Sequence, residues 1–229
     1  MSRRRDKSGG RRNGTYRQVA INDHVTQASP DEVFRAMAQV PGDLDWRVLA
    51  PNVLPVFPRR RPLPPETGQL LQVVLAPGIP TGFGIDIGPA VMHVGTDLVR
   101  TWGIDAGDVA TRALENLGRR TARATGRDVI AESVDGTVVR ALQSGWGWAS
   151  TLVLLPDELV RIFGPKPQVF IAPMRDLLMS APADTDPAFL GWLRGELASL
   201  DPNALALEAF TLHDGIVGYL PLDRASALA

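Results

Sequence analysis

Apolar side chains recur every three or four residues along several parts of the chain, as they do on one face of an amphipathic helix. In the segment 106–121, Val109, Ala113 and Leu117 fall on one face, and charged side chains fill the opposite face. Ser29 and Asp186 precede two other such segments, and both residue types favour the N-cap position of a helix. The pattern predicts helices over residues 30–40, 106–121, 156–163 and 187–200.

Runs of β-branched and other apolar residues predict strands. Two such runs, 128–134 and 137–143, flank Asp135-Gly136, a dipeptide typical of a type I′ turn in a two-residue hairpin. Asp214-Gly215 joins 210–213 to 216–220 in the same way. Further strands are predicted at 69–76 and 169–172, both buried, and at 90–94 and 149–155. Strand pairs with tight turns, and helices between them, indicate an α+β fold with a mostly antiparallel sheet and three to four helices packed on it.

The composition changes this picture little. With 229 residues, 45% hydrophobic and 21% charged, the chain has the balance of an ordinary globular protein and the length for a single α+β domain over residues 18–229. No apolar run approaches the roughly 18–20 residues that span a bilayer. The chain has no cysteine and only three histidines, which removes thiolate chemistry and leaves few metal ligands. We therefore expect a cytoplasmic protein without a metal, a cofactor or a membrane partner.

Charge divides the chain into a basic tail and an acidic body. Residues 1–17 carry seven Lys or Arg against Asp6, a net charge of +6, and the remaining residues carry 17 basic and 24 acidic side chains, a net charge of −7. The tail has too few apolar residues to offset its ordering entropy, so we expect 1–17 to be disordered. It is either a solvated tail or an arm for nucleic acid, which would be contacted through Arg3, Arg4, Arg5, Lys7, Arg11 and Arg12.

Two segments combine residues that restrict the backbone. Residues 51–65 contain six prolines around three consecutive arginines, which predicts an extended, irregular connector. Residues 77–89 contain four glycines and three prolines, with Asp86 between two isoleucines. The glycines do not match G-x-G-x-x-G, and a strand rather than a helix follows, so a phosphate loop is not favoured. We interpret this segment as a structural crossing in which Asp86 accepts hydrogen bonds from neighbouring backbone N–H groups.

Four polar residues are candidates for ligand binding. Asp86 and His93 offer a general acid–base pair, although His93 is equally well explained as a half-buried structural histidine. Arg175 carries a planar fork that binds carboxylates and phosphates. The alternative is that Arg175 forms a structural ion pair with Asp176 or with Asp86.

The segment 143–150 adds aromatic and hydroxyl side chains. Trp146 and Trp148 are separated by one glycine and either line a stacking pocket or anchor the core. Ser144 and Ser150 are possible nucleophiles, but neither lies in a Gly-x-Ser-x-Gly elbow and neither has an evident base.

Several short motifs are similar to those of a known family. The helix Ala113-Leu114-Glu115-Asn116-Leu117, the hairpin that follows it, the segment 149–154 and Pro173-Met174-Arg175-Asp176 resemble the YtpQ-like family of uncharacterised bacterial proteins. The similar part covers roughly residues 85–220. The resemblance implies an α+β cytoplasmic bacterial domain and supplies no catalytic residues.

Three functions are compatible with these observations. The leading hypothesis is a non-enzymatic domain that binds another protein, because no nucleophile–base pair or metal-ligand set is recognisable. The alternative is an enzyme or small-ligand-binding protein that takes an anionic small molecule at Asp86, His93 and Arg175. A further alternative is a nucleic-acid accessory protein that acts through the basic tail. The candidate ligand-binding residues are Asp86, His93, Trp146, Trp148, Arg175 and Asp176.

Overall fold

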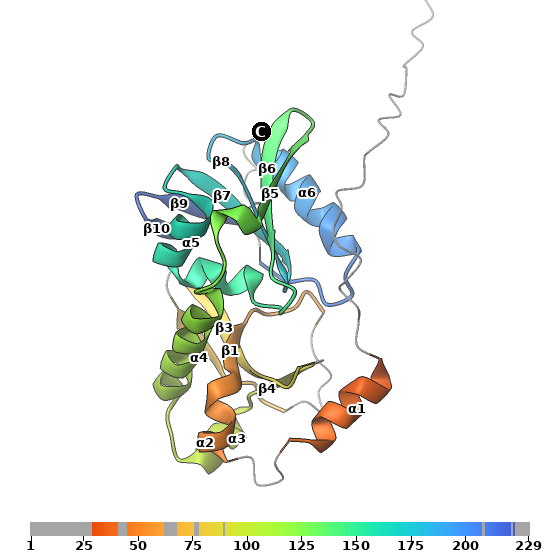
Figure 1. The fold of residues 1–229 in the computed structure, drawn as a ribbon, viewed down its shortest axis with the longest axis vertical. Helices are drawn as coiled ribbons and strands as arrows, with labels where there is room; N and C mark the ends of the chain where they lie inside the picture. The colour runs from red at the N-terminus through yellow and green to blue at the C-terminus, as the bar shows by residue number, and fades with distance from the viewer. Residues whose placement is uncertain are drawn as a thin grey trace, which may run out of the picture.

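The computed structural model describes residues 29–40, 45–61, 68–75, 78–88, 90–207, 209–220 and 222. The basic tail predicted at 1–17 lies outside these residues, as does the end of the proline-rich segment. Within the described residues the strands form two antiparallel sheets with helices packed against them, as Figure 1 shows. The predicted α+β fold with a mostly antiparallel sheet is therefore confirmed.

The smaller sheet is built around one long strand. Its members are β1 (Val53–Val56), β2 (Gln72–Leu75), β3 (Ile79–Asp86) and β4 (Val91–His93). In the described residues β3 pairs with β1 along one edge, and with β2 and then β4 along the other. The strand predicted at 90–94 is β4, whereas the strand predicted at 69–76 begins at Gln72 and is only partly buried.

The larger sheet has the order β10-β9-β7-β8-β6-β5 among the described strands. These strands are β5 (Val129–Val134), β6 (Thr137–Gln143), β7 (Gln168–Met174), β8 (Leu177–Pro182), β9 (Ala209–His213) and β10 (Ile216–Leu220). Both predicted hairpins are present. Asp135 and Gly136 have φ values of 48° and 82°, and Asp214 and Gly215 have φ values of 50° and 75°, so both turns use the left-handed region that a type I′ turn requires.

The longer helices lie where the amphipathic pattern predicts them. They are α1 (Pro30–Ala38), α4 (Ala106–Thr121), α5 (Pro156–Phe163) and α6 (Pro187–Ser199). Ser29, Asp105 and Asp186 each accept a backbone hydrogen bond at the N-cap position of a helix. Shorter elements that the pattern did not predict are α2 (Trp46–Leu49), α3 (Thr96–Trp102) and the 3₁₀ helices η1 (Ala50–Asn52), η3 (Gly126–Asp128) and η4 (Ala149–Leu154).

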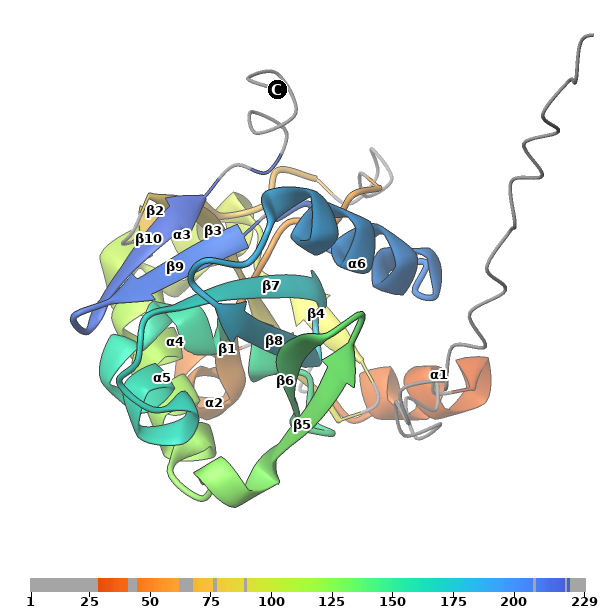
Figure 2. The same ribbon diagram turned by 90° about the horizontal axis from the view of Figure 1, so that it is seen from above.

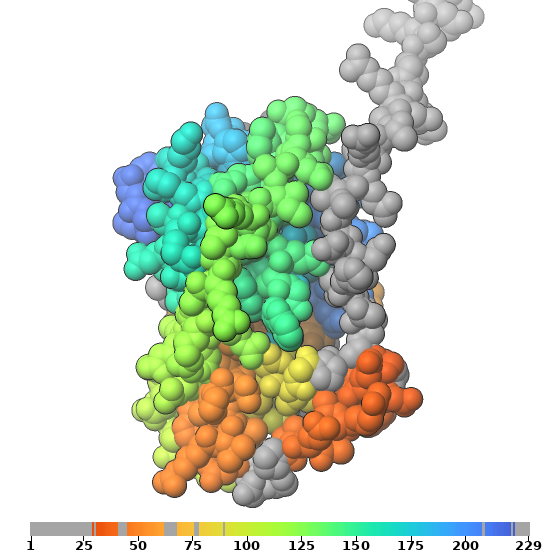
Figure 3. Space-filling model, viewed as in Figure 1, coloured from red at the N-terminus to blue at the C-terminus, as the bar shows by residue number. Residues whose placement is uncertain are grey.

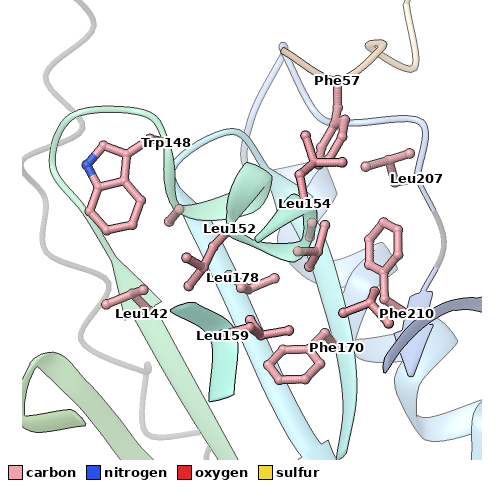
Figure 4. Packing of buried hydrophobic residues seen from close by; sticks show 14 of the residues in the cluster. Phe57, Leu142, Trp148, Leu152, Leu154, Leu159, Phe170, Leu178, Leu207 and Phe210 are labelled. Atoms are coloured by element: carbon pink, nitrogen blue, oxygen red, sulfur yellow. The ribbon is translucent and has the colours of Figure 1, made fainter. Parts of the chain in front are cut away.

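Three groups of buried side chains hold these layers together. One lies between the smaller sheet and α3 and α4, and another lies between the larger sheet and α6, which covers one face of that sheet in Figure 2. The largest group contains Leu54 and Ile79 of the smaller sheet together with Phe170 and Phe210 of the larger one. Figure 4 shows part of this group around η4. The two sheets therefore share one continuous hydrophobic core.

The proline-rich segment was wrongly predicted to be an irregular connector throughout, since residues 53–56 form β1. All four residues of β1 are buried, and Pro55 lies opposite Phe83 of β3. Proline is tolerated there because β1 is at the edge of the sheet, where one side of the strand needs no hydrogen-bonded partner.

The interpretation of 77–89 as a crossing is also wrong, because most of this segment is β3, the central strand of the smaller sheet. Its glycines allow close packing inside the sheet. A Cβ atom on Gly84 would overlap Cγ1 of Val91 on β4. The glycine content therefore reflects strand packing rather than a loop.

The strand predicted at 149–155 is in fact the 3₁₀ helix η4. Every residue of η4 is buried, so the continuous apolar run gave no period from which to distinguish a strand from a helix. The side-chain hydroxyl of Thr151 donates to the backbone oxygen of Trp148, which stabilises this turn.

Candidate functional site

The loop that follows β6, residues 144–148, is organised by one carboxylate. Asp176, in the turn between β7 and β8, accepts hydrogen bonds from the backbone N–H groups of Ser144 at 3.2 Å, Gly145 at 2.7 Å and Gly147 at 2.9 Å. Its Oδ1 atom also accepts from the hydroxyl group of Ser144. Asp176, which was a candidate ligand-binding residue, therefore holds the loop in place.

The other two backbone N–H groups of the loop donate hydrogen bonds to the side chain of Ser144. Its Oγ atom accepts from the backbone N–H groups of Trp146 and Trp148, each at 3.2 Å. Every backbone N–H group from residue 144 to residue 148 thus has a partner within the site. The loop is fixed, yet 72% of Trp146 is exposed, while Trp148 is buried in the shared core.

Arg175 packs against the same loop. Its Nε atom donates to the backbone oxygen of Gly147 at 2.9 Å. A Cβ atom on Gly147 would lie 3.0 Å from Cζ and Nε of Arg175, so the guanidinium rests directly on the glycine backbone. Burial lowers the pKa of Arg175, and the negative charges of Asp86 and Asp176 oppose that shift.

Asp86 forms its ion pair with Arg120 of α4 rather than with Arg175. The Oδ2 atom lies 2.6 Å from Nη1 of Arg120, and only 12% of the Asp86 side chain is exposed. Its Oδ1 atom accepts from the backbone N–H group of Gly88 at 2.9 Å, as predicted for this carboxylate. This ion pair connects the end of β3 to α4.

His93 takes no part in the hydrogen bonds and the ion pair described above. It lies opposite Gly84 in the β3–β4 register, on the same face of the sheet as Asp86. Its Nε2 atom is buried and has no hydrogen-bond partner among the described residues. Burial lowers the pKa of His93, and the positive charges of Arg59 and Arg175 lower it further. In the described structure Asp86 and His93 do not form the hydrogen bond that an acid–base pair would use.

A surface hollow of about 530 Å³ lies between the C-terminal end of α4 and the loop 144–148. We call it the arginine–tryptophan hollow. It is lined by Arg119, Arg120, Arg123, Ala124, Asp128, Leu142, Gln143, Ser144, Trp146 and Trp148. In Figure 3, α4 runs up the near face of the molecule, and the chain continues from its upper end towards the β5–β6 hairpin.

The arginines of the hollow differ in how they are held. Arg120 is paired with Asp86, whereas Arg119 donates to the amide oxygen of Asn116, a neutral partner. Asn116 is buried, and its side-chain nitrogen donates to the backbone oxygens of Ala50 and Val53, both at 2.7 Å. Arg123 is exposed. Arg119 and Arg123 therefore carry positive charge that a bound anion can meet.

The sequence-predicted candidates are only partly brought together. Trp146 and Trp148 line the hollow, and Asp86 adjoins it through Arg120. Arg175, Asp176 and His93 do not line it. Arg119 and Arg120 were not singled out from the sequence, because they were attributed to the solvent face of the helix, and Arg123 lies beyond the predicted end of that helix.

Nucleophilic and metal chemistry find little support in the geometry. Ser144 is bonded to a carboxylate without a histidine between them, and the hydroxyl of Ser150 is buried without a hydrogen-bond partner in the described structure. Among the described residues no group of three His, Asp or Glu side chains could hold a metal ion. Nor does the described part of the chain contain a helix long and apolar enough to cross a membrane.

The comparisons with known proteins do not identify a family. No protein-family model matches the chain, and neither a curated protein nor a solved structure is detectably similar to it. The resemblance to the YtpQ-like family stays a prediction, and any function rests on the site itself.

Proposed function

We propose that the protein binds a small anionic ligand in the arginine–tryptophan hollow. The observation that carries the proposal is the gathering of Arg119, Arg120 and Arg123 around a concave surface that also contains tryptophan. Guanidinium groups bind carboxylate and phosphate oxygens through charge-assisted hydrogen bonds, which are stronger than neutral ones. A volume of about 530 Å³ is typical of sites for small molecules.

The charge of the surroundings supports the same function. Residues 18–229 carry a net charge of −7, and the three arginines concentrate positive charge at one place on a body that is acidic overall. Asp86 neutralises Arg120, which leaves Arg119 and Arg123 as the cations for the ligand. Asp128 also lines the hollow and disfavours a ligand that carries negative charge near that wall.

Calorimetric titration with inorganic pyrophosphate tests the proposal. We expect saturable binding to the wild-type protein that weakens at higher salt. Replacing both Arg119 and Arg123 by Ala should weaken binding at least tenfold, because each removes a charge-assisted hydrogen bond of about 1.5–3 kcal/mol. Arg112→Ala is the matched control, since Arg112 is on the same helix but pairs with Glu115 away from the hollow. Absence of binding, or equal affinities of all variants, would contradict the proposal.

A second candidate function, binding of another protein, is favoured by α1. Phe34 and Met37 of this helix are 70% and 54% exposed, and the helix projects from one corner of the molecule in Figure 3. Exposed apolar side chains on one helix are typical of helix-in-groove recognition. The test is site-specific cross-linking from position 38, with the double variant Phe34→Ser/Met37→Ser. A single cross-linked species that this variant loses would support the function, and an unchanged pattern would contradict it.

A further inference from the structure

We propose that the ligand of the arginine–tryptophan hollow is a nucleotide, whose base stacks on Trp146 and whose phosphates bind Arg119 and Arg123. This inference rests on the proposed function, because it names the class of anion that the same hollow takes. It is carried by features that a simple anion site does not need.

The first feature is the presentation of Trp146. The Trp146 indole is 72% exposed, so its burial contributes little to the stability of the fold. The loop beneath it is fixed through Asp176 and Ser144. An aromatic ring on a loop whose backbone is already fixed loses less entropy when a flat partner stacks on it than a ring on an unordered loop does. Nucleobases stack on aromatic side chains in this way.

The second feature is the size of the hollow. A volume of about 530 Å³ lies in the range of sites that bind whole organic molecules, and a single phosphate group would fill only part of it. Ala124 and the exposed Trp146 add apolar surface to the lining, and an inorganic ion would make no favourable contact with that surface. An organic group attached to the anion accounts for both the volume and the apolar wall.

The third feature is Gln143, which lines the hollow and whose side-chain amide makes no hydrogen bond to another described residue. A free amide offers one acceptor and two donors, which suit the polar edge of a base. Gln143 is the last residue of β6, so its backbone is fixed by pairing with Leu177.

Charge favours a free nucleotide over a nucleic-acid strand. Arg119 and Arg123 supply a short cationic patch, and the body around them is acidic, with a net charge of −7 over residues 18–229. A strand needs a basic groove that follows its backbone over several phosphates. These two arginines of the hollow supply enough positive charge for one diphosphate or triphosphate group, but not for the backbone of a strand.

Calorimetric titration with four probes tests the inference: adenosine diphosphate, inorganic pyrophosphate, adenosine, and a single-stranded oligonucleotide of twelve thymidines. We expect adenosine diphosphate to bind at least fivefold more tightly than pyrophosphate, and adenosine alone to bind weakly. Trp146→Ala should remove this difference while pyrophosphate affinity stays within twofold of wild type. Trp192→Ala, which changes another partly exposed tryptophan on α6, should leave the difference intact.

The outcomes separate the two proposals. Equal affinities for adenosine diphosphate and pyrophosphate would overturn the nucleotide inference and leave anion binding in place. Tighter binding of the oligonucleotide than of adenosine diphosphate would also overturn it, in favour of a nucleic-acid site. No binding of any probe would overturn both proposals.

Discussion

Substitution of two neighbouring glycines by alanine isolates the contact between Arg175 and the loop 144–148. Gly145 and Gly147 have nearly the same left-handed backbone, with φ values of 69° and 70°. Both donate their N–H groups to Asp176. They differ in one respect, because a Cβ atom on Gly145 meets nothing within 4 Å, whereas a Cβ atom on Gly147 meets the guanidinium of Arg175 at 3.0 Å.

The expected losses of stability follow from that difference. Gly145→Ala costs about 1 kcal/mol of the free energy of unfolding, the strain of a left-handed non-glycine residue. Gly147→Ala carries the same strain and also displaces Arg175 from its 2.9 Å hydrogen bond to the Gly147 oxygen. A hydrogen bond from a charged group contributes about 1.5–3 kcal/mol, so the total loss should be about 3 kcal/mol.

Urea unfolding monitored by tryptophan fluorescence measures both losses from the midpoint and the m-value. The double variant Gly147→Ala/Arg175→Ala provides the second test. In the background of Arg175→Ala, the alanine at position 147 should cost no more than Gly145→Ala does in the wild-type protein. Equal losses for the two single alanine variants would refute the reasoning, since they would show that the guanidinium does not rest on Gly147.

Three other predictions concern the core and the pH dependence of stability. Gly84→Ala should destabilise the protein by about 1–3 kcal/mol in thermal unfolding, and Val91→Ala should restore part of that loss by making room for the new methyl group. Asn116→Ala should cost about 2–4 kcal/mol in urea unfolding, because it removes two 2.7 Å hydrogen bonds to buried backbone. Burial lowers the pKa of folded His93, so its contribution is complete above the unfolded pKa of about 6.5 and is lost as pH falls towards the folded pKa. His93→Gln should therefore flatten the decline of stability between pH 7 and 5. Parallel declines for wild type and His93→Gln would count against this account.

Local signals in the sequence were sufficient for the helices and hairpins. The N-caps at Ser29, Asp105 and Asp186 and the Asp-Gly turns act within a few residues, so the sequence alone reveals them. The apolar face of α4 was predicted for the same reason.

Elements that depend on distant partners were not predictable. Proline disfavours a strand inside a sheet, and Pro55 is tolerated because β1 pairs only with β3 among the described strands, which no spacing near Pro55 indicates. The glycines of β3 are typical of a loop in the sequence, and the reason for Gly84 is evident only from the packing of Val91 of β4 against it. The apolar run in η4 has no period because the core surrounds it on all sides.

Dependence on distant partners also explains which residues around the hollow were missed in the sequence. Trp146, Trp148 and Arg175 stood out by residue type and by their glycine and proline neighbours. The pairing of Asp86 with Arg120 spans 34 residues, and no local spacing distinguishes Arg120 from other arginines of α4. The arginines line the hollow because the fold places the end of α4 beside the loop 144–148, and their sequence positions do not show this.

The attachment of the loop 144–148 to Asp176 also ties the pose of Trp146 to the pairing of the larger sheet. Asp176 is 32 residues from Ser144, in the turn that joins β7 to β8. The register of β6 with β8, in which Gln143 lies opposite Leu177, places this carboxylate beside the loop amides. A substitution that shifts this register would move Asp176 away from the loop amides, even where the substituted residue lies far from the hollow. The shape of the hollow is therefore sensitive to changes elsewhere in the sheet.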